Sequence, residues 1–228
     1  GAAVVNWSSL PVRRPFERRP ARRFRPRVSP RSTGRSDTDK RVAHERPDVI
    51  RNLARDAQSF TSNVFLVSGE RTVLVDVGDD FDVVSAATEH VETVDAVVLT
   101  HTHYDHVGNL PAVVDAFGVD VWGYDTEQDG VDHALGDGET VQLGDHDYRA
   151  LHTPGHKDDH LCLYSAEAGG GFGRTDLEEG DRDRLVRSID NVLQTVPEDL
   201  GAMHTGHGPS ATDTPYRDIE MAWQAARF

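Results

Sequence analysis

LTHTHYDHVG, residues 99–108, places three histidines and one aspartate within six positions, directly after a short apolar segment. Imidazole and carboxylate groups are the ligands that zinc or iron prefers where thiolates are absent. His101 and His103 are two positions apart, so an extended or turning backbone can aim both rings at one ion, while Asp105 and His106 could face a second ion. A solvated polar loop needs no such concentration of ligands. The stretch therefore predicts a metal site.

Strands and helices are predicted to alternate on both sides of this stretch. Runs of apolar and β-branched residues indicate strands, and the pairs 63–67/72–77 and 140–143/147–151 are typical of hairpins. The predicted strands cover residues 63–67, 72–77, 96–100, 119–122, 140–143, 147–151 and 161–164. Apolar residues at helical spacing predict helices over residues 79–91, 110–117, 181–195 and 218–227, the first of them capped by Asp79 or Asp80. The alternation predicts the α/β class, with layered helices and sheets.

Four segments, in this order along the chain, resemble the metallo-β-lactamase superfamily. LVDVG at residues 74–78 looks like the strand-end Asp-Gly motif of that family, and residues 101–106 match its HxHxDH signature. TPGH at 153–156 and GHG at 206–208 look like the segments that carry its remaining metal histidines. Each of the last two is weak alone, but all four in sequence are specific. The resemblance covers about residues 58–228 and implies a four-layer αββα sandwich with the metal site at one edge, between the sheets.

The resemblance also implies a ligand set. One metal site would consist of His101, His103 and His156, and the other of Asp105, His106 and His207. Asp105 would also act in catalysis, by orienting a metal-bound water or accepting its proton. Asp76 would orient the ligand loop from behind. His160, at most an edge residue, and His204 are left outside the predicted site.

The chain departs from the family pattern at one ligand. The family usually carries an aspartate that bridges the two metals, in a Gly-Asp step on a strand after the third-histidine segment. Here residues 163–168 run straight into the glycines 169–171, so the strand and its aspartate are predicted to be missing. Neither Glu167 nor Asp176 is assigned to the bridging position. Either the deletion leaves one metal or an impaired pair, or the sequence omits a loop of the natural protein.

GRTD at 173–176 and GHG at 206–208 resemble most closely the hydroxyacylglutathione hydrolase branch. This resemblance implies a hydrolase that uses a metal-bound hydroxide on an ester or thioester carbonyl of a small molecule, with one or two zinc ions as cofactor. The alternatives are a persulfide dioxygenase with a single iron, a lactonase, and a catalytically impaired member of the family.

Charge divides the chain into two predicted parts. Residues 1–47 carry 13 Lys+Arg and 4 Asp+Glu, with many prolines and serines, and are predicted to be a disordered extension. Residues 48–228, the predicted metallo-β-lactamase-like domain, carry 11 Lys+Arg and 35 Asp+Glu. So large an acidic excess repels itself at low salt, which predicts a salt-adapted, halophilic protein; an ordinary acidic protein is the alternative. The basic extension could bind nucleic acid, but the acidic domain disfavours that partner.

Cys162 is the single cysteine, which excludes a disulfide within the chain and fits a cytoplasmic location. No apolar run approaches the roughly 20 residues of a membrane helix, so no membrane partner is predicted. The apolar residues 2–5 precede the arginines, so neither a secretory nor a twin-arginine signal is predicted. No oligomeric state follows from the sequence.

Overall fold

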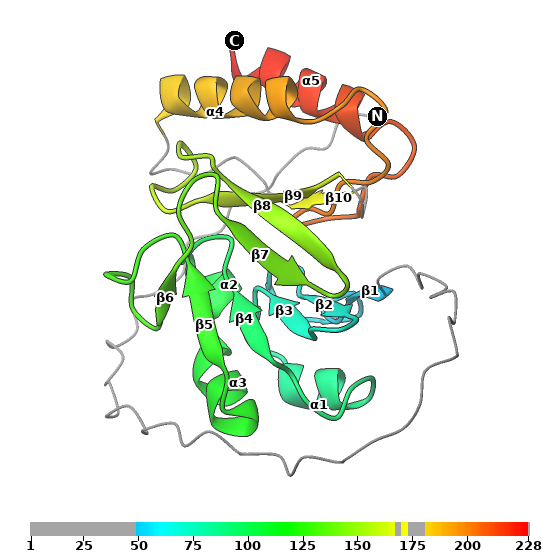
Figure 1. The fold of residues 1–228 in the computed structure, drawn as a ribbon, viewed down its shortest axis with the longest axis vertical. Coiled ribbons are helices and arrows are strands. Elements are labelled where there is room, and N and C mark those ends of the chain that lie inside the picture. The colour runs from blue at the N-terminus through cyan, green and yellow to red at the C-terminus, as the bar shows by residue number, and fades with distance from the viewer. Residues whose placement is uncertain (1–48, 167–169, 173–180, 228) are drawn as a thin grey trace, which may run out of the picture. The chain divides into compact units, whose positions relative to one another are not determined.

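The computed structural model describes residues 49–166, 170–172 and 181–227. The extension predicted for residues 1–47 lies outside these residues. Within them, ten strands form two sheets (Figure 1). No helix among the described residues is long and apolar enough to cross a membrane.

The first sheet has six strands in the order β1-β2-β3-β4-β5-β6. These strands are β1 (Val49–Asn52), β2 (Phe65–Ser68), β3 (Val73–Val75), β4 (Ala96–Val98), β5 (Asp120–Gly123) and β6 (His133–Ala134). The first three strands pair antiparallel, and β3 to β6 pair parallel. The predicted hairpin of β2 and β3 is confirmed.

The second sheet is antiparallel throughout, in the order β10-β9-β8-β7. Its strands are β7 (Thr140–Leu143), β8 (His146–His152), β9 (Leu161–Ser165) and β10 (Gly170–Phe172). The predicted loss of the strand after β9 is therefore wrong, because β10 pairs with β9 in that place. The sequence of β10, two glycines and a phenylalanine, does not predict a strand, because glycine has a low strand propensity. None of these three residues is a carboxylate, as expected from the missing aspartate.

Side-chain alternation along the first sheet builds two cores. On β3, Leu74 joins a cluster on the helix side, whereas Val73 and Val75 join a cluster between the two sheets. The same alternation applies to β4, where Val97 faces the helices and Val98 faces the other sheet. Because neighbouring side chains on a strand point to opposite faces, a strand buried on both sides is apolar throughout.

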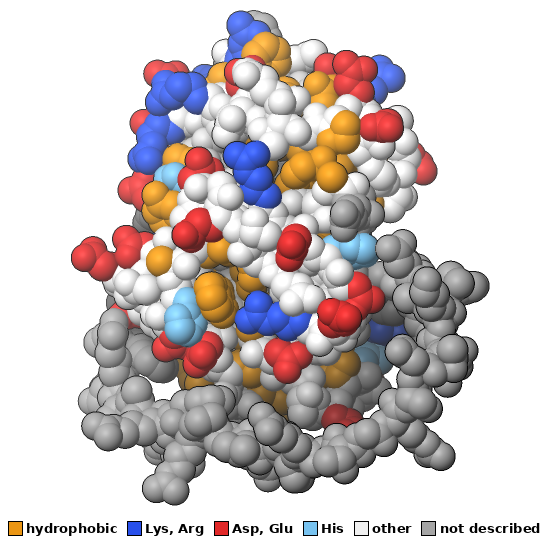
Figure 2. Space-filling view, viewed as in Figure 1, with side chains coloured by type: hydrophobic (Ala, Val, Ile, Leu, Met, Phe, Trp, Pro, Cys, Tyr) orange, Lys and Arg blue, Asp and Glu red, His pale blue; other side chains and the backbone are white. Residues whose placement is uncertain are grey.

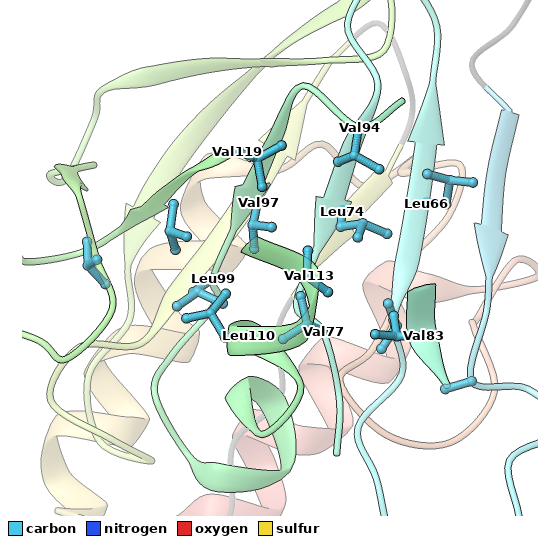
Figure 3. Packing of buried hydrophobic residues seen from close by; sticks show 14 residues of the cluster. Leu66, Leu74, Val77, Val83, Val94, Val97, Leu99, Leu110, Val113 and Val119 are labelled. Atoms are coloured by element: carbon cyan, nitrogen blue, oxygen red, sulfur yellow. The ribbon is translucent and has the colours of Figure 1, made fainter. Parts of the chain in front are cut away.

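Helices cover the outer faces of both sheets. The helices are α1 (Val83–Thr88), α2 (Tyr104–Val107), α3 (Leu110–Phe117), α4 (Arg182–Thr195) and α5 (Pro215–Ala226). Leu110 and Val113 of α3 pack on the strands of the first sheet (Figure 3). Helices α4 and α5 lie together beyond the four-stranded sheet (Figure 1). The layers are therefore helix, sheet, sheet and helix, which confirms the predicted αββα sandwich.

Helix α1 is shorter than predicted. It begins at Val83 rather than near residue 79, and its cap is Asp82, whose side chain accepts a hydrogen bond of 3.0 Å from Ser85 N. The prediction of Asp79 or Asp80 as the cap is wrong. Asp80 has a φ of +54°, a left-handed conformation that keeps this segment out of the helix.

Candidate metal centre

Four of the six predicted ligands, and Asp76, lie where parallel strands of the first sheet end. Strand β3 leads directly into Asp76, and β4 leads through Leu99 and Thr100 into His101. Because β3 and β4 are parallel neighbours, their carboxyl ends meet at one edge of the sheet. Helix α2 begins one residue after His103 and carries Asp105 and His106. The six predicted ligands form two groups here. These groups are the same two sets of residues as the two predicted metal sites.

The first group brings together three imidazole nitrogens. His156 Nε2 lies 3.1 Å from His101 Nε2 and 3.0 Å from His103 Nδ1. The rings of His101 and His156 are buried. At the Zn–N distance of about 2.05 Å, two nitrogens in a tetrahedral site lie roughly 3.3 Å apart, so this spacing fits the ligands of one ion.

The second group adds a carboxylate to two imidazoles. Asp105 Oδ2 lies 3.0 Å from His207 Nε2 and 3.8 Å from His106 Nε2. The ring centroids of His106 and His101 are only 3.9 Å apart, so the two groups adjoin. The arrangement can hold two neighbouring cations, each with three protein ligands.

His207 reaches the site on a loop that Asn63 holds. The Asn63 side-chain amide donates to Thr205 O at 2.7 Å and to Gly208 O at 2.8 Å, and Asn63 N donates to Gly206 O at 2.6 Å. Phe60, just before this anchor, is 73% exposed and stacks on His207 with ring centroids 6.0 Å apart. An apolar ring therefore stands at the rim of the second group.

Asp76 lies behind the ligands, as the resemblance implied. Its Oδ1 accepts a hydrogen bond from Thr100 N at 2.8 Å, and its Oδ2 accepts from Thr100 Oγ1 and from His106 Nδ1, both at 2.7 Å. With a proton on Nδ1, His106 presents the lone pair of Nε2 to the second group. Asp76 is buried and has a φ of +56°, a strained conformation for a residue with a side chain. Such strain is characteristic of functional sites.

The pKa shifts of His101 and Asp105 suit metal ligands. Burial, followed by the charges of the neighbouring histidines, holds the pKa of His101 well below its ordinary value. Burial alone would raise the pKa of Asp105, but the hydrogen bond from His207 and the nearby His106 outweigh it and lower the pKa to about 2. Neutral imidazoles and an ionised carboxylate are the forms that bind metal.

The two histidines left outside the predicted site do lie outside both groups. His160 is fully buried, where its Nδ1 lies 2.7 Å from Thr153 Oγ1, and burial lowers its pKa to about 3. His204 bonds Ser210 Oγ at 2.9 Å. Sequence reasoning missed Thr100 and Asp159, which contact the ligand segments; their positions beside the histidine motifs were the only available signal.

Two sheets stacked between helices, with histidines at the strand ends, define an αββα sandwich with a metal-binding edge. A sequence model of the metallo-beta-lactamase superfamily matches residues 58–173, just over half of the chain, so the chain belongs to this superfamily. It is 32% identical over 154 residues to a hydroxyacylglutathione hydrolase of Klebsiella pneumoniae, covering 62% of this chain and 60% of that protein. The chain thus spans less than two thirds of this relative, whose name agrees with the predicted branch.

Solved structures agree on the fold. TTHA1623, determined in a di-iron-bound form, is 28% identical with a TM-score of 0.55, covering 66% of this chain and 89% of that one. ETHE1 from Myxococcus xanthus is 24% identical with a TM-score of 0.59, covering 72% and 79% of the two chains. At this lower identity the second likeness concerns the fold alone.

Proposed function

We propose that the chain is a metal-dependent hydrolase that acts on an ester or thioester carbonyl of a small molecule. The observation that carries the proposal is the convergence of six ligand-type side chains into two adjoining groups. In this proposal the first group, His101, His103 and His156, holds one ion. The second group, Asp105, His106 and His207, holds the other.

The donor set fits hard or borderline divalent metals. Five imidazoles and one carboxylate, without thiolate, suit zinc and iron equally. Bound there, such an ion lowers the pKa of water to about 7 and polarises a carbonyl oxygen. Asp105 is the proposed catalytic residue. Its carboxylate lies among the ligands of the second group, where it would orient the attacking water or accept its proton.

Similarity to a hydroxyacylglutathione hydrolase supports a thioester as the substrate class. Charge supports a small molecule over a nucleic acid, because residues 48–228 hold 35 acidic and 11 basic side chains and would repel phosphate. Figure 2 shows acidic side chains spread over the visible face, with basic ones between them. The exposed Phe60 beside His207 offers contact to an apolar part of the acyl group.

One observation favours a second candidate, an oxidative enzyme with a single iron, or an impaired hydrolase. The described residues of the two groups supply six ligands and no bridging carboxylate. Against this, the six side chains already form two adjoining groups of three without a bridging carboxylate, which favours two ions. The likeness to a protein solved with two irons supports a two-ion centre of either metal.

The test is the metal content of the full chain, by elemental analysis after purification in high salt without added metal. We expect about two zinc ions per chain, together with hydrolysis of a hydroxyacyl thioester such as S-lactoylglutathione. About one iron per chain would favour oxidation instead, and no bound metal would overturn the proposal.

Substitution supplies the control for activity. His101→Ala should abolish hydrolysis, because it removes a ligand of the first group whose ring also packs against His106 of the second group. His90→Ala, which removes an exposed histidine after α1, should leave hydrolysis unchanged. Equal rates in the two variants would exclude this site as the catalytic centre.

A further inference from the structure

Asp159 is a buried carboxylate that the proposed chemistry does not use. It is 3% exposed and follows His156 by three residues. Its Oδ2 accepts hydrogen bonds from Thr102 N at 3.1 Å and from Thr102 Oγ1 at 2.6 Å. Thr102 stands between His101 and His103. One carboxylate oxygen therefore ties the segment with two histidines of the first group to the loop with the third.

Lys157 completes this arrangement. Its Nζ donates to Thr102 Oγ1 at 2.8 Å and lies 3.6 Å from Asp159 Oδ1. The Thr102 hydroxyl has one hydrogen, and its shorter contact, 2.6 Å to Asp159 Oδ2 against 3.1 Å to Gln128 Oε1, assigns that hydrogen to Asp159. The lone pairs of the hydroxyl oxygen remain for Lys157. A buried carboxylate is stable only when it is paired and hydrogen-bonded, so the ammonium group supports the charge of Asp159. Lys157 is the only lysine after residue 47, which sets this contact apart from the arginine pairs elsewhere.

Main-chain bonds already join the two loops at their base. Leu161 N donates to Thr100 O at 2.7 Å, and Thr153 N donates to His160 O at 2.8 Å, which closes the loop that carries His156. Asp159 adds the contact nearest the ligands, on the peptide that links His101 to His103. Burying the Asp159 carboxylate costs free energy. The Thr102 peptide gains a fixed orientation in return, which explains why the carboxylate is buried there.

We propose that Asp159, held by Lys157, is the positioning residue of the first metal group. It fixes the Thr102 peptide so that the nitrogens of His101 and His103 meet that of His156. The inference rests on the proposed function, in that the first group has to bind a metal. Asp76 acts in the same manner on the second group, through His106. Partners behind metal ligands typically contribute about 10–100-fold to metal affinity.

The experiment measures zinc affinity by chelator competition in two single-site backgrounds of the full chain. His207→Ala leaves the first group intact, and His103→Ala leaves the second. Asp159→Asn should weaken zinc binding about 10–100-fold in the first background and leave it unchanged in the second. Asp158→Asn is the matched control, because the Asp158 side chain is 87% exposed and pairs with Arg184 at 2.6 Å. This control should leave both affinities unchanged.

A second pair of variants separates positioning from charge and covers a failure of Asp159→Asn to fold. Thr102→Val removes the hydroxyl and retains every charge, and it should weaken binding in the first background. Thr102→Ser keeps the hydroxyl and should bind as tightly as the unmodified chain. The visible absorption of bound cobalt(II) should change with Thr102→Val in the first background only.

The outcomes distinguish the two proposals. Unchanged first-group affinity in Asp159→Asn or Thr102→Val, or an equal loss in both backgrounds, would overturn the positioning role while the metal centre stands. If the His207→Ala background bound no zinc with Asp159 intact, the proposed metal function itself would fail, and the inference with it.

Discussion

Replacing Asp76 by asparagine should weaken the second metal site while leaving the backbone intact. Asparagine has nearly the same shape and tolerates the left-handed φ of +56° at this position. Its oxygen can still accept from Thr100 N, as Oδ1 of Asp76 does at 2.8 Å. Its amide group, however, then faces His106 Nδ1, which lies 2.7 Å from Oδ2 of Asp76.

Two donors cannot share that contact, so His106 either loses its partner or moves its proton to Nε2. The second choice removes the lone pair that faces Asp105 and His207. Loss of such a supporting partner weakens metal binding by about 10–100-fold, equivalent to about 1.4–2.7 kcal/mol.

Chelator competition on the metal-loaded chain measures this loss directly. We expect Asp76→Asn to release an ion at lower chelator concentration than the unmodified chain does. Asp80→Asn is the control, because Asp80 is also left-handed, with a φ of +54°, but is exposed. Two ions held as tightly in Asp76→Asn as in Asp80→Asn would refute the reasoning.

Three further predictions concern the rest of the domain. Because screening relieves acidic repulsion, thermal melts should show a higher Tm in molar salt than at low salt, and equal Tm values would argue against salt adaptation. Burial raises the pKa of Cys162 to about 11, so at neutral pH the folded chain should resist alkylation by iodoacetamide, which should proceed once the chain is unfolded; rapid labelling of folded protein would contradict this. Gly155→Ala should destabilise the chain in urea by at least about 1–3 kcal/mol, because φ is +132° and the new Cβ would lie 2.5 Å from Leu185 Cα. Gly118→Ala, which meets nothing within 4 Å at a φ of +66°, should cost less, and equal losses would mean that backbone strain alone accounts for the effect.

Local patterns predicted the candidate ligand segments because each of these residues stands in a short sequence motif. His101 and His103 follow a buried strand, and TPGH and GHG mark the two distant histidines. Runs of apolar and β-branched residues likewise predicted most strands of both sheets. The residues of each such pattern lie within a few positions of one another, where their spacing determines which way their side chains point.

Contacts between distant segments could not be predicted in the same way. Asp159 meets Thr102 across 57 positions, and Asn63 meets Thr205 across 142. An aspartate in a loop looks solvated until the fold buries it. Strand β10 was missed because its pairing with β9, rather than its composition, makes it a strand. The left-handed backbone conformation of Asp76 likewise belongs to the turn after β3, and the sequence pattern did not predict it.

The hydrogen bonds from Asn63 to the His207 loop determine how much of the chain the second group needs before it can assemble. A growing chain that has emerged as far as residue 161 already contains every side chain of the first group, together with Asp159. The second group also needs His207, whose loop is held by hydrogen bonds from Asn63, early in the described residues. In the proposed centre the first group can therefore assemble on a shorter length of chain than the second, whose loop depends on a contact between residues 142 positions apart.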